Sequence, residues 1–139
     1  MSLIAGDLWE ISVPDEWQHR QDPECYTMIP APDSALQITA ATKDGEITIE
    51  DMEDIAKERL KQVPRREDVT TGDFSGFTYC YYDGGFFCRE WYVARGSVML
   101  FVTYTCEHRL AEPADEAMMD VLETLRISRT ASDTFQRAS

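Results

Sequence analysis

The sequence contains no long hydrophobic run. None of its apolar stretches approaches the ~20 residues that a membrane-spanning helix needs, so no segment is expected to cross a membrane. The first residues also lack the basic and then apolar segments of a secretory signal. The four cysteines are not grouped in closely spaced pairs, which argues against the disulfide framework of a small secreted protein. Together these absences predict a cytoplasmic protein.

Positive charge is scarce. The chain has 13 lysine and arginine residues against 26 aspartate and glutamate residues, which gives a formal net charge of -13. Such a surface repels phosphate groups, so neither nucleic acid nor an anionic membrane surface is expected as a partner. The acidity permits a basic protein partner without requiring one, because solubility alone is a sufficient reason for it.

Catalytic signatures are also lacking. There is no phosphate-binding loop, no dinucleotide fingerprint and no G-x-S-x-G motif. Cys80, Cys88, Cys106 and His108 are residue types that bind zinc. However, strand geometry places Cys106 about 10 Å beyond Cys88 and on the opposite face. We interpret Cys106 and His108 as a strand end followed by a surface histidine, so no catalytic residue, metal or cofactor is expected.

Residues 74–106 organise the rest of the chain. They form three strand-like runs joined by glycine turns at Asp83-Gly84-Gly85 and Arg95-Gly96. A two-residue turn at Arg95-Gly96 pairs Trp91 with Leu100. Because side chains alternate along a strand, these two residues are expected to share one face of the sheet.

The first of these turns is compatible with two registers. A two-residue loop puts the preceding aromatic residues on the face opposite Trp91, whereas a three-residue loop, 83–85, puts them on the same face. We prefer the three-residue loop, because it creates one continuous apolar face and register follows the buried face. That face comprises Phe77, Tyr79, Tyr81, Phe87, Trp91, Val93, Val98, Leu100, Val102 and Tyr104. The same register puts Cys80 opposite Cys88, interpreted as two buried thiols because a directly cross-strand disulfide demands a special geometry.

Two helices are predicted. The clearer one spans residues 48–63, with Thr48 as N-cap and Asp51 at the third position of an imperfect capping box. Its expected buried stripe is Ile49, Met52, Ile55, Ala56, Leu60 and Val63. The second begins with Pro113, a residue favoured at the first helical position. Its expected stripe is Ala114, Ala117, Met118, Val121, Leu122 and Leu125.

Further strands are predicted at residues 8–13, 25–29, 35–42 and 68–73, with a polar loop at 19–23. Alternation in the first and third of these directs Trp9, Ile11, Val13, Leu36, Ile38 and Ala40 inward. We expect one domain over residues 1–128 and a disordered tail over 129–139. Since both faces of the central sheet are apolar, each needs a cover. The prediction is an α+β fold, an antiparallel sheet of about six strands flanked by two helices in an α/β/α sandwich.

The order of elements is informative. The predicted elements follow one another in this order: a strand, the Pro14-Asp15-Glu16-Trp17 turn, a strand pair, a helix, an aromatic meander with Arg89-Glu90-Trp91, and a final helix ending at Leu125-Arg126-Ile127. Over about residues 7–128 this order resembles the PsbP-like fold. That fold is shared by a photosystem extrinsic subunit, a Ran-binding nuclear import factor and bacterial DcrB-type proteins. The resemblance implies a bacterial, non-catalytic binding module with an accessory or chaperone-like role, and it identifies no active site.

We therefore expect the chain to bind another protein and to catalyse nothing. The candidate surface is aromatic, because aromatic side chains are favoured at interfaces. It consists of Trp17, Tyr26, Tyr82, Phe86 and Tyr92. Two alternatives remain open: an immunity-type protein that neutralises a basic toxin, and a small-ligand carrier with a pocket between sheet and helix. A homodimer is also compatible with the sequence.

Overall fold

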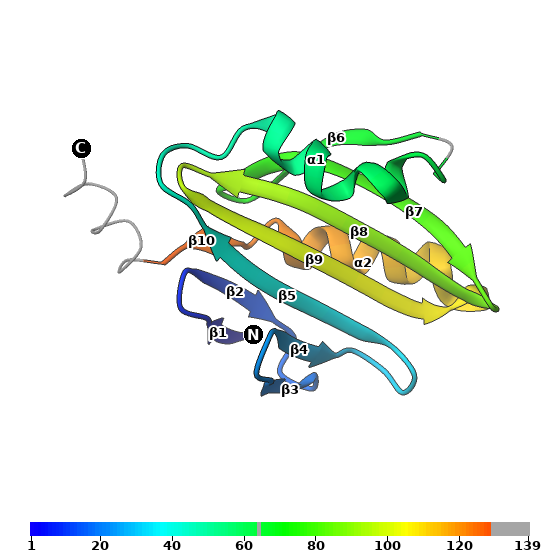
Figure 1. The fold of residues 1–139 in the computed structure, drawn as a ribbon. Helices are drawn as coiled ribbons and strands as arrows, with labels where there is room; N and C mark the ends of the chain where they lie inside the picture. Colours follow the sequence, from blue (N-terminus) through cyan, green and yellow to red (C-terminus); the bar gives the residue numbers. More distant parts are fainter. Residues whose placement is uncertain (64, 129–139) are drawn as a thin grey trace.

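The computed structural model describes residues 1–63 and 65–128, and within them a seven-stranded antiparallel sheet forms the centre of the protein (Figure 1). The predicted tail at 129–139 lies outside the described residues. In spatial order the strands are β3 (Gln18–Gln21), β4 (Tyr26–Ile29), β5 (Ala35–Thr42), β9 (Val98–Glu107), β8 (Phe86–Arg95), β7 (Phe74–Asp83) and β6 (Glu67–Thr71). The long meander β7–β8–β9 is the predicted organising stretch.

A second, smaller sheet joins segments from both ends of the described chain. It consists of β1 (Ser2–Ala5), β2 (Trp9–Val13) and β10 (Arg126–Ile127), with β2 in the middle and antiparallel to both neighbours. Trp9, Ile11 and Val13 of β2 are buried, so the predicted alternation of this strand is confirmed. β1 and β10 were not predicted, because short edge strands carry little periodicity of their own.

The central sheet is covered on both faces. Helix α1 (Ile49–Leu60) lies on one face and helix α2 (Ala111–Leu122) on the other, reached from β9 through a short 3-10 turn, η1 (His108–Leu110) (Figure 1). The small sheet packs into the same apolar core as α2. The α+β class and the antiparallel sheet are thus confirmed. The central sheet has seven described strands where about six were predicted, and the second covering layer combines a helix with the unpredicted three-stranded sheet.

The turn between β7 and β8 contradicts our preferred register. It is a two-residue loop, Gly84-Gly85, with φ angles of 57° and 86°, and Asp83 pairs directly with Phe86. Two positive φ angles are what a two-residue hairpin turn of this kind requires, and glycine supplies both. Phe77, Tyr79 and Tyr81 therefore lie on the α1 side, opposite Trp91.

This register also separates two cysteines. Cys80 pairs with Arg89 and Cys88 with Tyr81, so the two thiols lie on opposite faces of the sheet. Side chains alternate along each strand, and the change from a three-residue to a two-residue loop moves one strand by a single position. All four cysteines are free thiols.

The turn between β8 and β9 is displaced by one residue from the prediction. It consists of Gly96 and Ser97, which pairs Trp91 with Val102 and Val93 with Leu100. The pairing shifts by two positions, and an even shift leaves every side chain on its predicted face. Trp91 and Leu100 are accordingly both fully buried in the core beneath α2.

The ends of α1 follow the predicted local signals, whereas its buried face is narrower than predicted. Thr48 and Asp51 form a complete capping box, with both reciprocal hydrogen bonds present. Met52 and Ala56 are buried, but Ile55 is 59% exposed and Ile49 38% exposed. A single helix lying on a sheet buries only the narrow part of its surface that faces the strands.

Three other predictions need correction. Most of the predicted polar loop at 19–23 belongs to the edge strand β3. All four side chains of β3 are exposed, so its sequence has no apolar alternation that would indicate a strand. Ala40 near the end of β5 is exposed. α2 begins at Ala111, two residues before Pro113, and Ala117 is exposed while Met118, Val121, Leu122 and Leu125 are buried. Neither helix within the described ranges has the length and hydropathy that a membrane crossing requires.

Candidate functional site

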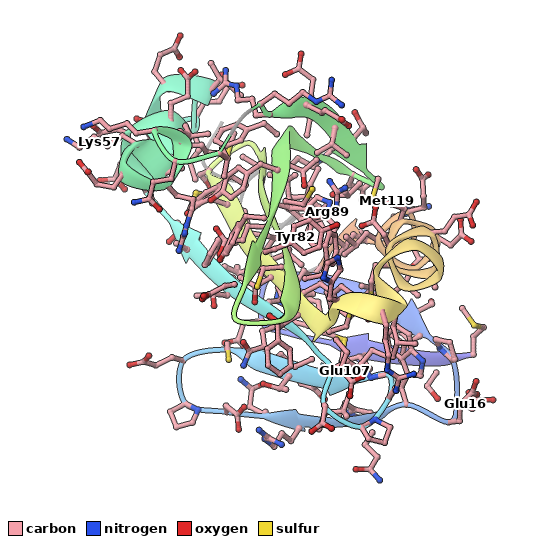
Figure 2. The ribbon with its side chains drawn as sticks, turned by 90° about the vertical axis from the view of Figure 1, so that its right-hand side faces the viewer. Glu16, Lys57, Tyr82, Arg89, Glu107 and Met119 are labelled. Atoms are coloured by element: carbon pink, nitrogen blue, oxygen red, sulfur yellow. The ribbon has the colours of Figure 1, made fainter. Side chains whose placement is uncertain are left out.

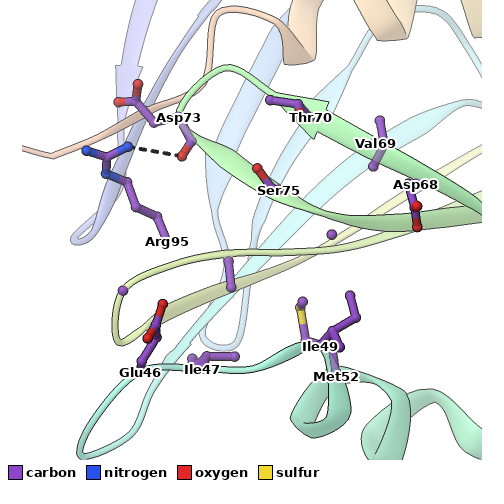
Figure 3. A pocket seen from close by; sticks show the side chains of 13 residues that line it. Glu46, Ile47, Ile49, Met52, Asp68, Val69, Thr70, Asp73, Ser75 and Arg95 are labelled. Atoms are coloured by element: carbon purple, nitrogen blue, oxygen red, sulfur yellow. Dashed lines mark hydrogen bonds between the residues drawn. The ribbon is translucent and has the colours of Figure 1, made fainter.

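An open groove of about 740 Å³ lies on the α1 face of the central sheet, between the start of α1 and strands β6 to β8 (Figure 3). Its floor is made of small residues, Ser75 and Gly76 from β7 and Ala94 from β8. Elsewhere on this face the same strands carry Phe77, Tyr79 and Tyr92. The groove therefore exists where aromatic side chains give way to small ones.

Gly76 is required by the close approach of two strands. A Cβ atom at this position would lie 1.8 Å from the backbone carbonyl oxygen of Tyr92, and a backbone atom cannot move aside as a side chain can. Any larger residue would force β7 and β8 apart. Gly76 thus keeps the sheet continuous beneath the groove.

The two walls of the groove differ in chemistry. One wall is apolar and consists of Ile47, Ile49 and Met52 around the start of α1. The opposite wall is polar and is formed by the exposed side chains of Asp68 and Thr70 on β6 (Figure 3). A ligand between them would meet hydrocarbon on one side and a carboxylate and a hydroxyl on the other.

Negative charge predominates in the groove. Glu46 and Asp68 contribute carboxylates, and neither of them forms an ion pair with a described residue. Arg95 is the cation among the lining residues, and its Nη1 donates to the backbone oxygen of Asp73 at 3.5 Å (Figure 3). The Asp73 carboxylate does not face α1: it accepts from the N–H of Ile127 in β10 at 2.9 Å, and Figure 3 shows it directed away from the groove. The groove is suited to a ligand with positive charge and some apolar surface.

The five aromatic residues predicted as a binding surface do not come together. Tyr82, labelled in Figure 2, and Phe86 are 58% and 40% exposed at the end of the β7–β8 hairpin. The ring centroids of Tyr82 and His108 are 4.3 Å apart. Trp17 and Tyr26 are half-buried against the core, and the Tyr26 ring meets Trp9 edge-on. Tyr92 is buried, stacked on Phe77 beneath α1. Aromatic type alone could not distinguish these positions.

The groove itself was missed in the sequence. Its signal was the interruption of aromatic strands by Ser75, Gly76 and Ala94, which only a correct register would have aligned. The residues considered for zinc are dispersed. Cys106 is buried on the α2 side and His108 is exposed, and no group of three or more potential ligands is found among the described residues.

A polar cluster lies further along the same face. The carboxylate of Glu90 accepts hydrogen bonds from the hydroxyls of Tyr79, at 2.5 Å, and Tyr81, at 2.9 Å. Burial raises the pKa of both phenols, and the neighbouring carboxylate raises it further. Both hydroxyls therefore remain protonated donors that hold Glu90 in a fixed position.

This cluster predicts a loss of stability at alkaline pH. The ordinary pKa of tyrosine is 10.0, and the folded protein keeps Tyr79 and Tyr81 protonated above it. Because the folded state then binds more protons than the unfolded state, the free energy of unfolding falls as the pH rises beyond about 10. We expect the urea midpoint to fall between about pH 9 and pH 11, and to fall less in Tyr79→Phe, which has one such phenol fewer. Identical pH profiles for the two proteins would contradict this assignment.

The architecture places the chain among small α+β proteins whose antiparallel sheet is covered by helices on both faces. No protein-family model and no curated protein matches the sequence. Solved structures do match. A Bacteroides thetaiotaomicron protein has a TM-score of 0.61 and 14% identity, over 87% of this chain and 45% of that one. This chain therefore spans less than half of that protein.

LpqN of Mycobacterium tuberculosis, described as involved in cell envelope biogenesis, has a TM-score of 0.56 and 17% identity, over 86% of this chain and 83% of its own. At such identities the likeness shows a shared fold and nothing more. The cyanobacterial PsbP protein (CyanoP) of Synechocystis is also among the similar structures, with a TM-score of 0.49 and 10% identity over 86% of each chain.

Proposed function

We propose that this protein is a non-catalytic binding module whose groove beside α1 takes an extended, positively charged segment of another protein. The observation that carries the proposal is the groove itself, with an apolar wall, a floor of small residues and the carboxylates of Glu46 and Asp68, which form no ion pair with a described residue. Open grooves of this kind match peptide segments better than compact metabolites, which are usually enclosed.

The position of β6 supports an extended partner. β6 is the last strand of the central sheet, and its outer side pairs with no described strand. Residues Asp68, Val69 and Thr70 belong both to this edge and to the groove lining. A segment that added to the edge as a further strand would direct alternate side chains toward the α1 side of the sheet. Backbone hydrogen bonds would hold the segment, and the groove would select its side chains.

The charge distribution supports a basic partner. Lysine or arginine side chains of the segment would reach the carboxylates of Glu46 and Asp68, while its apolar side chains would contact Ile47 and Ile49. The net charge of -13 adds a long-range attraction that accelerates encounter with a cationic partner. A basic toxin bound by an immunity-type protein would be one such partner.

Kinship with the PsbP-like proteins is part of this proposal, because those proteins are mostly binding modules without catalysis. The shared fold of LpqN, a protein involved in cell envelope biogenesis, is compatible with an accessory role. These are analogies at the level of the fold, and the binding claim depends on the groove.

The test begins with selection from a random nonapeptide display library on the purified protein. We expect enrichment of lysine or arginine alternating with apolar residues. The best peptide is then measured by fluorescence anisotropy against Ser75→Trp, which fills the floor from an exposed strand position, and Asp68→Lys, which reverses one wall charge. Each variant should weaken binding at least about tenfold, or about 1.4 kcal/mol.

Asp120→Lys is the matched control, because Asp120 is exposed on α2 at the other face and the charge change is the same. Its affinity should differ little from that of the original protein, and thermal melting checks that all variants are folded. Enrichment of acidic peptides, or unchanged affinity in Ser75→Trp, would reject the groove as the binding site.

A further inference from the structure

A second pocket, smaller and separate from the groove, lies between the C-terminal half of α1 and the sheet. Its volume is about 330 Å³, which is at the lower end of the range for small-molecule sites. Its lining includes Arg59 and Gln62 from α1, Glu90 and Tyr92 from β8 and Phe101 from β9. One cationic, two anionic and two aromatic side chains line a space too small for a folded partner.

The two opposite charges of this pocket do not neutralise one another. Arg59 and Glu90 form no salt bridge with each other or with any other described residue. Arg59 Nη1 donates to Gln62 Oε1 at 3.1 Å, and Glu90 accepts from two tyrosine hydroxyls. Both charged groups are half-buried, and a charge that is partly removed from water without a counter-charge costs free energy. A ligand that brings one charge of each sign would remove that cost.

Tyr81 holds the two charges apart. The Arg59 guanidinium lies over its ring, with the central carbon 4.2 Å from the ring centroid, while its hydroxyl donates to Glu90 Oε2 at 2.9 Å. One rigid side chain therefore sets the spacing between cation and anion. The pocket's other carboxylate, Glu58, is exposed and paired with Lys61 Nζ at 3.5 Å, so it does not compete with Glu90.

An apolar wall completes the site. The rings of Tyr92 and Phe101 lie side by side with centroids 4.7 Å apart, and Ala56 of α1 packs in the same cluster. We propose that this pocket binds an α-amino acid with an apolar side chain, its ammonium group on Glu90, its carboxylate on Arg59 and its side chain against Phe101. This site is independent of the groove and goes beyond the proposed protein-binding function.

The decisive experiment uses the unmodified protein. Each of the twenty common L-amino acids is tested by thermal shift and isothermal titration calorimetry, and an apolar one should bind. The binder is then compared with its C-terminal amide, which lacks the anion, and with its deaminated acid, which lacks the cation. Each analogue should bind at least about tenfold more weakly. If no amino acid binds, or if either analogue binds as well as the parent, the proposal is overturned.

Variants locate the site. Glu90→Gln removes the negative charge, keeps one acceptor oxygen for a tyrosine hydroxyl and offers an amide N–H to the other. Arg59→Gln removes the positive charge. Each should weaken the parent amino acid at least about tenfold, while Glu90→Gln should barely affect the deaminated acid. Glu116→Gln, an exposed position on α2, is the matched control and should bind like the original protein. Unchanged affinity in Glu90→Gln would also overturn the proposal.

Discussion

Replacement of Trp91 by alanine is expected to lower the free energy of unfolding by about 3–5 kcal/mol, the cost typical of deleting a fully buried large aromatic side chain. Trp91 has no exposed surface and lies in the main core, between the middle of the sheet and α2. Its truncation leaves a cavity that the surrounding strands cannot close, because β8 is hydrogen-bonded to β7 on one side and to β9 on the other. Urea unfolding followed by circular dichroism measures the change.

Two companion substitutions make this result interpretable. Tyr82→Ala removes an aromatic ring that is 58% exposed and should cost much less than Trp91→Ala. Trp91→Phe should also destabilise less than its loss of volume suggests. The buried indole Nε1 has no hydrogen-bond partner among the described residues, so the substitution removes an unpaired donor. If Trp91→Ala were no more destabilising than Tyr82→Ala, the core assignment of the meander would be wrong.

Replacement of Asp115 by alanine is expected to lower the free energy of unfolding by about 2–3 kcal/mol. This is less than the 3–5 kcal/mol typical of breaking a fully buried ion pair, because solvent screens part of the interaction between the two charges. Arg89 and Asp115 form a bidentate ion pair between β8 and α2, with Nε–Oδ1 and Nη2–Oδ2 distances of 2.6 and 3.0 Å. Their side chains are 14% and 28% exposed. Asp115→Ala leaves the Arg89 guanidinium with Thr78 as its remaining hydrogen-bond partner among the described residues, at 3.3 Å.

A double-mutant cycle separates the pair from its surroundings. Arg89→Met combined with Asp115→Leu replaces both charges by apolar groups and should recover most of the stability lost in Asp115→Ala. The surface pair Lys57–Asp54, with side chains 63% and 79% exposed, provides the control, and Asp54→Ala should cost well under half as much. Additive effects of the two substitutions at Arg89 and Asp115 would contradict a direct energetic coupling across the sheet–helix contact.

Local signals predicted local features well. Thr48 and Asp51 identified the start of α1 because both halves of a capping box lie within four consecutive residues. The burial of Trp9, Ile11 and Val13 followed from alternation within five residues of β2. In each case the physical cause and its sequence signal occupy the same short segment, so no knowledge of distant elements was needed.

The register of the first hairpin depended on distant elements. Asp83-Gly84-Gly85 permits either loop, and the preferred register assumed that Phe77, Tyr79 and Tyr81 share the face of Trp91. In the fold α1 covers Phe77 and Tyr79, while α2 and the small sheet cover Trp91, so two apolar faces are stable together. The groove and the pocket beneath α1 depend on that same register, which is why they could not be predicted from residue types.

The small sheet has a consequence for synthesis on the ribosome. β2 is among the first strands to leave the exit tunnel, yet Ile127, which pairs with Trp9, emerges after every other described strand has been made. Until then the indole of Trp9 and its apolar neighbours on β2 have no complete binding surface and remain available to nascent-chain chaperones. Docking of β10 would then be the last step in the folding of the described strands.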